Sequence, residues 1–480
     1  MQTELFLRMN SEETAGSTMQ DERQTKRELK MLTDPIPKVT LEMAIPTIIA
    51  FLITSIYNLA DTFFVSSLGT NATAAVSVNA SLDQIIMMGG SVFAIGAASY
   101  ISRLLGARKK EKAVEVLSTV WFIAFAFGML ILLFGTVFMR PMVRVLGATE
   151  SGETYAVQYA TYVLLVAPVM AASFVMNQCL RAEGSALYSM IGMGFGGVLN
   201  CFLDPIFIFG LGLGVTGASM ATAISKLVSF LILIVPYVRG SSMLKISIRR
   251  FRPEKRMLYE VISVGSSSLL RNGLAVISAI VLNHIAGGIS DSVLAGIGVS
   301  NRIMMFPFGI ILGFGSGYQP VAGFNWGAER YDRVRECYGF ACKFSIIGSA
   351  VMGLAIALLA VPIIRLFSAV DPHMQQIGAL CIRLQCLVLP IHAWVAMVNM
   401  LCASLGYAGY AVILATARQG TCFFPIVYPL AWIFGGNGAA GTQAAADLLT
   451  IIPAAIIIRK MLAIIAAREA AMPRAEEIAG

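Results

Sequence analysis

The chain has 480 residues, of which 57% are hydrophobic and 13% charged, and it carries a net charge of +8. A soluble protein contains about 25% charged residues, so this composition excludes a water-soluble fold. The apolar residues fall into runs of roughly 20, the length that an α-helix needs to cross a hydrocarbon core of about 30 Å. The sequence therefore predicts an all-α polytopic membrane protein.

The predicted elements begin with a polar, charged segment, residues 1–35, which we expect to be a disordered cytoplasmic tail. The first apolar run is too long and too internal to be a cleaved signal peptide. An N-terminal lobe is predicted at 36–239, with spans at 39–67, 72–102, 113–139, 155–180, 187–210 and 216–238. After a basic linker, 240–257, a C-terminal lobe is predicted at 258–466, with spans at 258–286, 292–324, 333–366, 374–404, 409–434 and 438–465. A short cytoplasmic tail, 467–480, ends the chain.

The Lys and Arg residues alternate between the connections that join these twelve spans. They crowd the even-numbered connections, as in the stretches 108–112, 239–256 and 330–335, and both tails are also basic. Cytoplasmic loops hold the excess of Lys and Arg, so both termini are predicted to lie in the cytoplasm, with the protein in the cell membrane. Topology and anionic lipid headgroups then account for the positive charge, and we expect no nucleic-acid partner.

An internal repeat appears when the chain is aligned with itself so that Gly96 falls on Gly317. The stretch GAASYISRLLGARKKEKAVE, from Gly96, then matches GYQPVAGFNWGAERYDRVRE, from Gly317, and Gly217-Ala218 falls on Gly438-Ala439. Because the shift covers six spans, the two halves have the same orientation in the membrane. The sequence thus predicts twelve transmembrane helices in two six-helix lobes, related by a pseudo-two-fold axis along the membrane normal.

Asp61 is the acid within a span that most needs an explanation. An ionised side chain at bilayer depth costs roughly 2.5 to 3.5 kcal/mol on insertion scales, and no Lys or Arg lies within a helical turn of Asp61. Tyr57 and Asn58 precede it by about one turn, so the three side chains share a helix face. A carboxylate in this setting takes up a proton or holds a cation.

Asp204, in the run NCFLDPIF, is the second such acid. Asn200 lies one turn before it, and Pro205 follows it and leaves the carbonyl oxygen of Cys201 without its helical partner. The topology places Asp61, Asp204 and Thr222 at a similar depth. Carboxylate, amide and carbonyl oxygens suit Na⁺, although such residues also serve as hydrogen-bonding groups between packed helices.

Other polar residues in the spans are less easily interpreted: Asp83, Lys226, Arg271, Arg302, Arg383 and Asp447. Some of them are expected to pair across helices, and the arginines of the second half favour an anionic cargo. The three histidines and eight cysteines show no metal-ligand spacing, and the cysteines are interpreted as small buried hydrophobic residues. No Walker motif and no clustered catalytic set is present, so we expect neither a cofactor nor an enzyme.

The motifs YNLADTFFV, GARKKEKA, NCFLDPIF with GVTGASMATAIS, and GFNWGAERYDRV together resemble those of the multidrug and toxic compound extrusion (MATE) family, bacterial type, over residues 35–465. The resemblance implies a V-shaped pair of six-helix lobes with alternating access. It places Asp61, Asn200, Asp204 and Thr222 at the cation-coupling positions, for Na⁺ or H⁺, and makes Pro46 the hinge of the first span. Gln319, Pro320 and Asn325 keep the family pattern, but no acid lies in spans seven or eight, where another branch of the family has one.

We therefore expect a monomeric antiporter that exchanges Na⁺ or H⁺ for an amphipathic, cationic compound. Tyr57, Asn58, Asp83, Gln319 and Arg302 are candidates for the substrate cavity. The alternatives are a flippase or exporter of a lipid-linked or anionic metabolite and, from another class, a membrane-embedded enzyme. No metal site is expected beyond Na⁺ at the four coupling residues.

Overall fold

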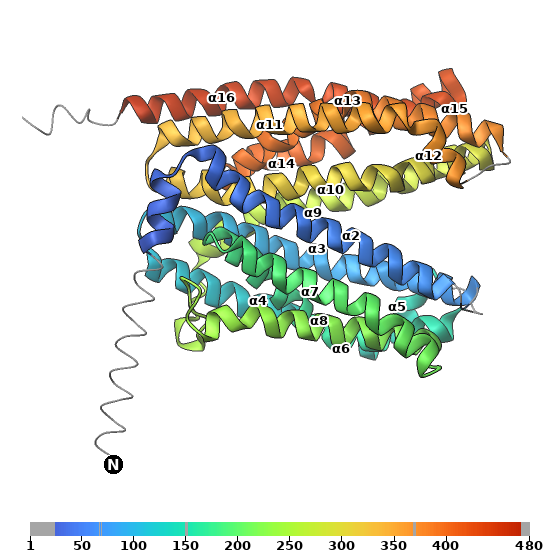
Figure 1. The fold of residues 1–480 in the computed structure, drawn as a ribbon, viewed down its shortest axis with the longest axis horizontal. Coiled ribbons are helices and arrows are strands. Elements are labelled where there is room, and N and C mark those ends of the chain that lie inside the picture. The colour runs from blue at the N-terminus through green and yellow to red at the C-terminus, as the bar shows by residue number, and fades with distance from the viewer. Residues whose placement is uncertain (1–24, 67, 69, 149–151, 368–370, 472–480) are drawn as a thin grey trace, which may run out of the picture.

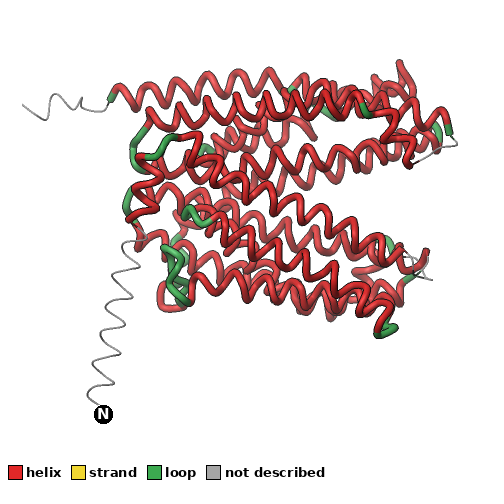
Figure 2. Tube along the Cα trace, viewed as in Figure 1, coloured by secondary structure: helices red, strands yellow, loops and turns green. Residues whose placement is uncertain are grey.

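The computed structural model describes residues 25–66, 68, 70–148, 152–367 and 371–471. Helices make up nearly all of these residues, and Figure 2 shows the loops gathered at the two ends of the bundle. The first half contains α2 (Ile36–Ser66), α3 (Thr70–Gly106), α4 (Lys110–Val137), α5 (Met139–Val145), α6 (Glu153–Ala182), α7 (Ala186–Pro205), η1 (Ile206–Gly210) and α8 (Gly214–Val238) (Figure 1). The second half contains η2 (Ile248–Arg250), α9 (Lys255–Ile289), α10 (Asp291–Gly327), α11 (Tyr331–Leu358), α12 (Ala360–Phe367), α13 (Pro372–Ser404), α14 (Ala408–Thr416), η3 (Ala417–Thr421), α15 (Phe424–Leu449) and α16 (Ile451–Ala470).

The number of membrane spans depends on how the last helices are divided. Among the described residues, 11 segments are long and apolar enough to cross a membrane, and the last of them, Ala408–Ala470, has 63 residues. A straight helix of that length would measure about 95 Å, three times the hydrocarbon core. Gly435 breaks it, with φ 56° and ψ −133°, and a Cβ at Gly438 would lie 1.9 Å from the carbonyl oxygen of Leu430. The segment is therefore two spans that meet at Gly435, and the described chain has the twelve spans predicted.

The helices form two lobes of six spans each, α2 to α8 and α9 to α16. We call the end of the bundle that carries loops 107–109, 239–254 and 328–330 the basic end. In Figure 1 the two lobes lie together at this end and diverge towards the other. The lobes touch mainly through α2, α3, α9 and α10. The predicted fold class is confirmed, and most predicted spans match the helices to within a few residues. The span predicted at 333–366 covers both α11 and α12, and the last two spans are divided at Gly435, inside α15. The predicted domain limits remain predictions.

Two glycines related by the internal repeat lie at one of the closest approaches between the lobes. A Cβ at Gly106 would lie 1.9 Å from the carbonyl oxygen of Phe324, and a Cβ at Gly327 would lie 1.9 Å from that of Arg103. The alignment that places Gly96 on Gly317 also places Gly106 on Gly327 and Arg103 on Phe324. The contact is therefore two-fold symmetric, and it requires residues without a side chain.

The repeat shifts by one position within α6 and α13 and in the helices that directly follow them. Gly184 and Gly406, which the shifted alignment pairs, both adopt a positive φ, of 84° and 85°. Asn177 donates to the carbonyl of Ser189 at 3.0 Å, and Asn399 donates to that of Ala411 at 2.7 Å, so this hydrogen bond also recurs in the shifted alignment. We call the alignment of Gly96 with Gly317 the first register and that of Gly184 with Gly406 the second register.

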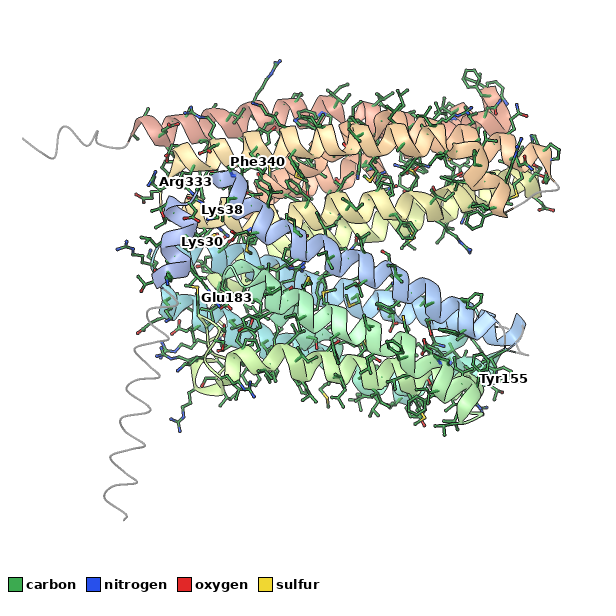
Figure 3. All side chains as sticks on the ribbon, in the orientation of Figure 1. Lys30, Lys38, Tyr155, Glu183, Arg333 and Phe340 are labelled. Atoms are coloured by element: carbon green, nitrogen blue, oxygen red, sulfur yellow. The ribbon has the colours of Figure 1, made fainter. Side chains whose placement is uncertain are left out.

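The N-terminal tail departs from the prediction. Residues 1–24 lie outside the described part, but residues 25–33 form a helix, so the expectation of disorder up to Asp34 is wrong for that segment. We call residues 25–34 the N-terminal strap. Arg27 donates to Ser185 Oγ at 2.8 Å in the first lobe, and Arg333 of the second lobe donates to the carbonyls of Met31 and Asp34 at 3.1 and 2.7 Å. The strap therefore ties the two lobes together at the basic end, where Figure 3 labels Lys30 and Arg333.

The outer surface is suited to lipid. Large apolar side chains are exposed over both lobes, including Leu133, Phe202, Val351 and Trp432. Among the cysteines six are buried, as expected, while Cys201 and Cys422 are partly exposed. The core lies between the helices of each lobe and across the lobe interface at the basic end.

Candidate functional site

Three of the predicted coupling residues form a buried hydrogen-bonded group between α7 and α8. The Asn200 side-chain amide donates to Asp204 Oδ1 at 3.0 Å and lies 3.4 Å from Thr222 Oγ1. All three side chains are buried. Pro205 ends α7 and leads into the π-helical turn η1, and Pro at this place removes a backbone donor. Irregular helix turns of this kind are often found at functional sites.

Two further acids reach the same region from α2 and α3. The charge of Asp83 acts on Asp61, and that of Asp61 acts on Asp204. Tyr159 of α6 connects the set, because its hydroxyl lies 3.5 Å from Thr222 Oγ1 and the charges of all three acids act on it. We call Asp61, Asp83, Asn200, Asp204 and Thr222 the first-lobe acid cluster.

The first-lobe acid cluster contains buried oxygens without hydrogen-bond partners. These atoms are Oδ1 of Asp61, of Asp83 and of Asn200, together with Oδ2 of Asp204. Buried polar atoms are nearly always paired, so this set suits a proton or a cation held by carboxylate and amide oxygens. Among the described residues there is no group of three His, Cys, Asp or Glu side chains placed for a metal ion. A cation here would need the amide and hydroxyl oxygens as well.

Lys226 of α8 places a positive charge beside these acids. Its ammonium donates to the Tyr57 hydroxyl at 3.0 Å and lies 5.3 Å from the centre of the Tyr57 ring. Its charge acts on Asp61 and on Asp83. No Lys or Arg lies within a turn of Asp61 along α2, as the sequence indicates, and the cation that acts on it comes from another helix. Lys226 lies one turn after Thr222, on the same face of α8.

A cavity of about 110 Å³ lies beside the cluster, within the first lobe. Its lining is mostly apolar, with Asn200, Thr222 and Lys226 as polar groups, and it includes Tyr57. The complete lining comprises Thr54, Tyr57, Met87, Met170, Ser173, Phe174, Asn177, Met193, Gly196, Gly197, Asn200, Thr222, Ser225, Lys226, Ser229 and Leu233. An apolar pocket with a few convergent polar groups is typical of a small-molecule site.

The second lobe holds a different ionic group. Arg418 of η3 forms a two-pronged ion pair with Asp447 of α15, and His392 Nδ1 lies 3.8 Å from Asp447 Oδ1. Phe308 of α10 packs its ring 4.9 Å from the Arg418 guanidinium and 4.8 Å from the His392 ring. We call these four residues the second-lobe ion group. Unlike Asp204, Asp447 is neutralised by an arginine.

The two-fold repeat relates this ion group to the first-lobe cavity. In the first register, Phe308 and Asp447 correspond to Met87 and Lys226, and in the second register, His392 and Arg418 correspond to Met170 and Gly196. All four of these first-lobe residues line the cavity. Arg418 thus stands in the second lobe at the position that Gly196 holds in the first, where the glycine backbone packs closely against Ser225 and Ser229 of α8. The lobes differ because a glycine in the first corresponds to an arginine in the second, and a lysine to an aspartate.

The remaining predicted residues are dispersed. Asn58 is exposed, as are Arg302 and Arg383. Gln319 lies between the lobes, away from the first-lobe cavity. Pro46 lies inside the continuous helix α2, and its role as a hinge remains a prediction.

Sequence reasoning did not find Arg418, and it named Lys226 without a role. The signal that could have found both is the repeat itself, which pairs Lys226 with Asp447 and Gly196 with Arg418. Comparing the paired residues in the two registers would have marked positions 87, 170, 196 and 226, with their counterparts 308, 392, 418 and 447, as one site that differs between the lobes.

Comparison with known proteins covers both lobes. A family model described as MatE matches residues 46–206 and 267–433. The chain is 28% identical over 437 residues to the multidrug export protein MepA of Staphylococcus aureus (strain MSSA476), covering 88% of this chain and 94% of MepA. It is 27% identical over 432 residues to MepA of Staphylococcus saprophyticus, covering 88% and 93%.

Solved structures give the same result. A crystal structure of MATE in complex with MaL6 superposes with a TM-score of 0.85 and 25% identity, covering 92% of this chain and 99% of that one. A multidrug resistance MATE family transporter of the MOP superfamily in an outward-facing conformation also gives 0.85 and 25%, covering 92% and 98%. The similarity therefore extends over the whole membrane region.

Proposed function

Since the chain belongs to the MATE family of membrane transporters, we propose that it exports amphipathic organic compounds in exchange for a cation that enters through the first lobe. Members of this family are transporters and not enzymes. The relatives named multidrug export proteins favour a drug-like cargo. The proposed coupling cation is Na⁺ or H⁺, and the proposed setting is the cell membrane, with both termini and the basic end in the cytoplasm.

The observation that carries the proposal is the set of unpaired buried oxygens on Asp61, Asp83, Asn200 and Asp204. Leaving such atoms without partners is costly, so the site gains stability when a proton or cation arrives. The only acid of the second-lobe ion group is already paired with Arg418. This difference between the lobes, with unpaired oxygens in the first and a paired acid in the second, supports ion coupling in the first lobe.

The cavity beside the cluster links the cation to the cargo. Asn200 and Thr222 belong to both the cluster and the cavity wall, and Tyr57 joins the wall to Lys226. Protonation or cation binding at Asp61 or Asp204 changes the charge beside the cavity. It thereby changes the affinity for a charged cargo, which is the thermodynamic requirement for coupling.

The test is export from proteoliposomes that contain the purified protein. Asp61→Asn and Asp204→Asn keep the size of the side chain but remove the charge, and each is expected to abolish gradient-driven export while the protein still folds. Asp371→Asn is the matched control, because Asp371 caps α13 in the second lobe and Asn caps equally well. Export at the full rate in Asp61→Asn would remove this residue from the mechanism.

The same proteoliposomes separate the two coupling ions. A Na⁺ gradient and a pH gradient are imposed one at a time, with the membrane potential clamped. Export under only one of them identifies the coupling ion, and export under neither contradicts antiport.

A second candidate function is export of an anionic or lipid-linked compound. It is favoured by Lys226, whose ammonium lines the first-lobe cavity, and by the positive charge of Arg271, which acts on His392 in the second lobe. Expression in a drug-sensitised host distinguishes the two. Resistance to cationic dyes supports the first function, and its absence under both ion gradients supports the second.

A further inference from the structure

A buried arginine at the interface between the lobes forms no ion pair with an acid among the residues that the structure describes. Arg181, the last basic residue of α6, is 2% exposed. Its Nε and Nη1 atoms are buried and have no hydrogen-bond partner. No acidic side chain lines the cavity beside it in the described part of the chain.

The nearby acids are engaged elsewhere. Glu183, just beyond it in the chain, accepts from Ser242 Oγ at 2.6 Å and from the Met243 backbone N–H at 2.9 Å, and the cation acting on it is Arg27. Glu260 accepts from Arg103 at 3.2 Å. Arg181 therefore holds a buried positive charge that these groups do not neutralise.

A small cavity opens beside the Arg181 side chain. Its volume of about 10 Å³ corresponds to one water-sized occupant. The lining consists of Ala98, Ser99, Ser102, Gln178, Arg181, Ser316, Gln319, Pro320 and Ser404. It is polar and carries no acid. Gln178, Ser316 and Gln319 bring side-chain N–H and O–H groups that can donate alongside the guanidinium.

A buried charge is stable only when it is paired, and an arginine pairs best with an anion through charge-assisted hydrogen bonds. We propose that this cavity, which we call the Arg181 site, binds a small monovalent inorganic anion such as chloride. The small size of the cavity favours a monatomic anion over phosphate, sulfate and organic carboxylates. The donors around it and the lack of a lining acid disfavour a cation.

The position of the site gives the anion a conformational role. Arg181 and Gln178 come from α6, and Ser99 and Ser102 from α3, all in the first lobe; Ser316, Gln319 and Ser404 come from α10 and α13 of the second. The cavity exists as one site only while the lobes are together at the basic end. A ligand that binds one conformation shifts the population towards it, so chloride stabilises the arrangement described here.

Two measurements on the purified full-length protein test the proposal. In the first, crystals are soaked in bromide, and an anomalous peak is expected within hydrogen-bonding distance of the Arg181 guanidinium. In the second, thermal unfolding is compared in sodium chloride and sodium gluconate at equal ionic strength. Chloride is expected to raise the midpoint in a saturable manner, by about 2 °C.

Two variants are compared with the wild type in the thermal-unfolding measurement. Arg181→Met replaces the charge with an apolar chain of similar length, and it is expected to give equal midpoints in chloride and gluconate. Arg333→Gln is the control, because Arg333 is also buried at the basic end but donates to Asn325 Oδ1 at 3.0 Å and to the Met31 and Asp34 carbonyls. It should lower both midpoints and keep the chloride shift.

Each result of these measurements either supports or overturns anion binding at the Arg181 site. An anomalous peak at Arg181, or a chloride shift lost in Arg181→Met and kept in Arg333→Gln, supports the site. A wild-type structure with only water there after the bromide soak overturns it, as does a chloride shift that persists in Arg181→Met. If Arg181→Met does not fold, the bromide soak of the wild-type protein still gives the answer.

Discussion

Gly106 and Gly327 pack against each other's neighbours across the lobe interface, each one against a carbonyl in the helical turn before the other. This reciprocal contact places two backbones in direct contact at the basic end. It is one of the places in the interface that tolerate no side chain, and it lies on the turns that first revealed the internal repeat.

Adding one methyl group at this contact should separate the lobes. In Gly106→Ala or Gly327→Ala, the new Cβ would lie 1.9 Å from a carbonyl oxygen, so the backbones must move apart, at a cost of about 1 to 3 kcal/mol. We expect a lower unfolding midpoint and a shift away from the conformation described here, measured by thermal unfolding and by protease accessibility of the basic end.

Gly309→Ala is the matched control for that prediction. Gly309 lies in α10, the helix of Gly327, and a Cβ there would have no atom within 4 Å. This variant should leave the midpoint unchanged or raise it slightly. A loss of stability equal to that of Gly327→Ala would show that helical glycine in general, rather than the lobe contact, is responsible.

Removing one partner of the second-lobe ion group should destabilise the protein without abolishing the dependence of export on the ion gradient. Asp447→Asn leaves the Arg418 charge buried and unbalanced, which costs about 3 to 5 kcal/mol for a buried pair. The double variant Arg418→Met, Asp447→Leu removes both charges and should recover most of the unfolding midpoint.

Export by the double variant then tests which lobe couples export to the ion gradient. We expect the dependence on the ion gradient to persist, because the unpaired oxygens belong to the first lobe. A stable double variant that exports without any gradient dependence would assign coupling to the second lobe instead.

Lys226 should weaken cation binding at the first-lobe acid cluster. Its charge acts on Asp61 and Asp83, so Lys226→Met removes a repulsion between the ammonium and an arriving cation. We expect the apparent affinity for the coupling cation to rise about tenfold, equivalent to ~1.4 kcal/mol. Export rate against ion concentration, measured in proteoliposomes, gives this affinity. Lys226→Arg keeps the charge and should leave the affinity near that of the wild type.

Glu183, in the connection between α6 and α7, should make stability depend on pH. Burial raises the pKa of Glu183 from 4.5 to about 7, which means that the folded protein holds a proton the unfolded chain releases. Stability from this group is therefore full below pH ~4.5 and declines as pH rises to about 7, by about 3 kcal/mol. Thermal unfolding between pH 5 and 8 measures the decline.

Glu183→Gln should flatten that part of the pH profile, since the amide does not titrate. Its oxygen can still accept from Ser242 and from the Met243 N–H, so the local structure is expected to remain. A decline of the same size in Glu183→Gln would assign the pH dependence to another group.

The spans and their two-fold repeat could be predicted because hydropathy and Gly-Ala turns are local properties of the sequence. The acids Asp61 and Asp204 could be named for the same reason, since a carboxylate in an apolar run stands out. The approach of Lys226 to Asp61 could not be predicted, because Lys226 comes from α8, a helix distant from α2 in the sequence. Helix contacts of that kind depend on tertiary packing.

The helical structure of the N-terminal strap also depends on tertiary contacts that the sequence alone does not predict. Its composition is polar and favours disorder, yet it forms a helix because carbonyls at its end accept from Arg333 and Arg27 reaches Ser185. The break at Gly435 is another example, since a hydropathy window continues across it without interruption.

The N-terminal strap also bears on the transport cycle. Arg27 holds it to one lobe and Arg333 to the other, so the lobes cannot part at the basic end unless one set of these hydrogen bonds breaks. In the proposed cycle the strap is then released and rebound in each turnover. A protease should therefore cut residues 25–34 faster during active export than at rest, a readout that needs no label on the cargo.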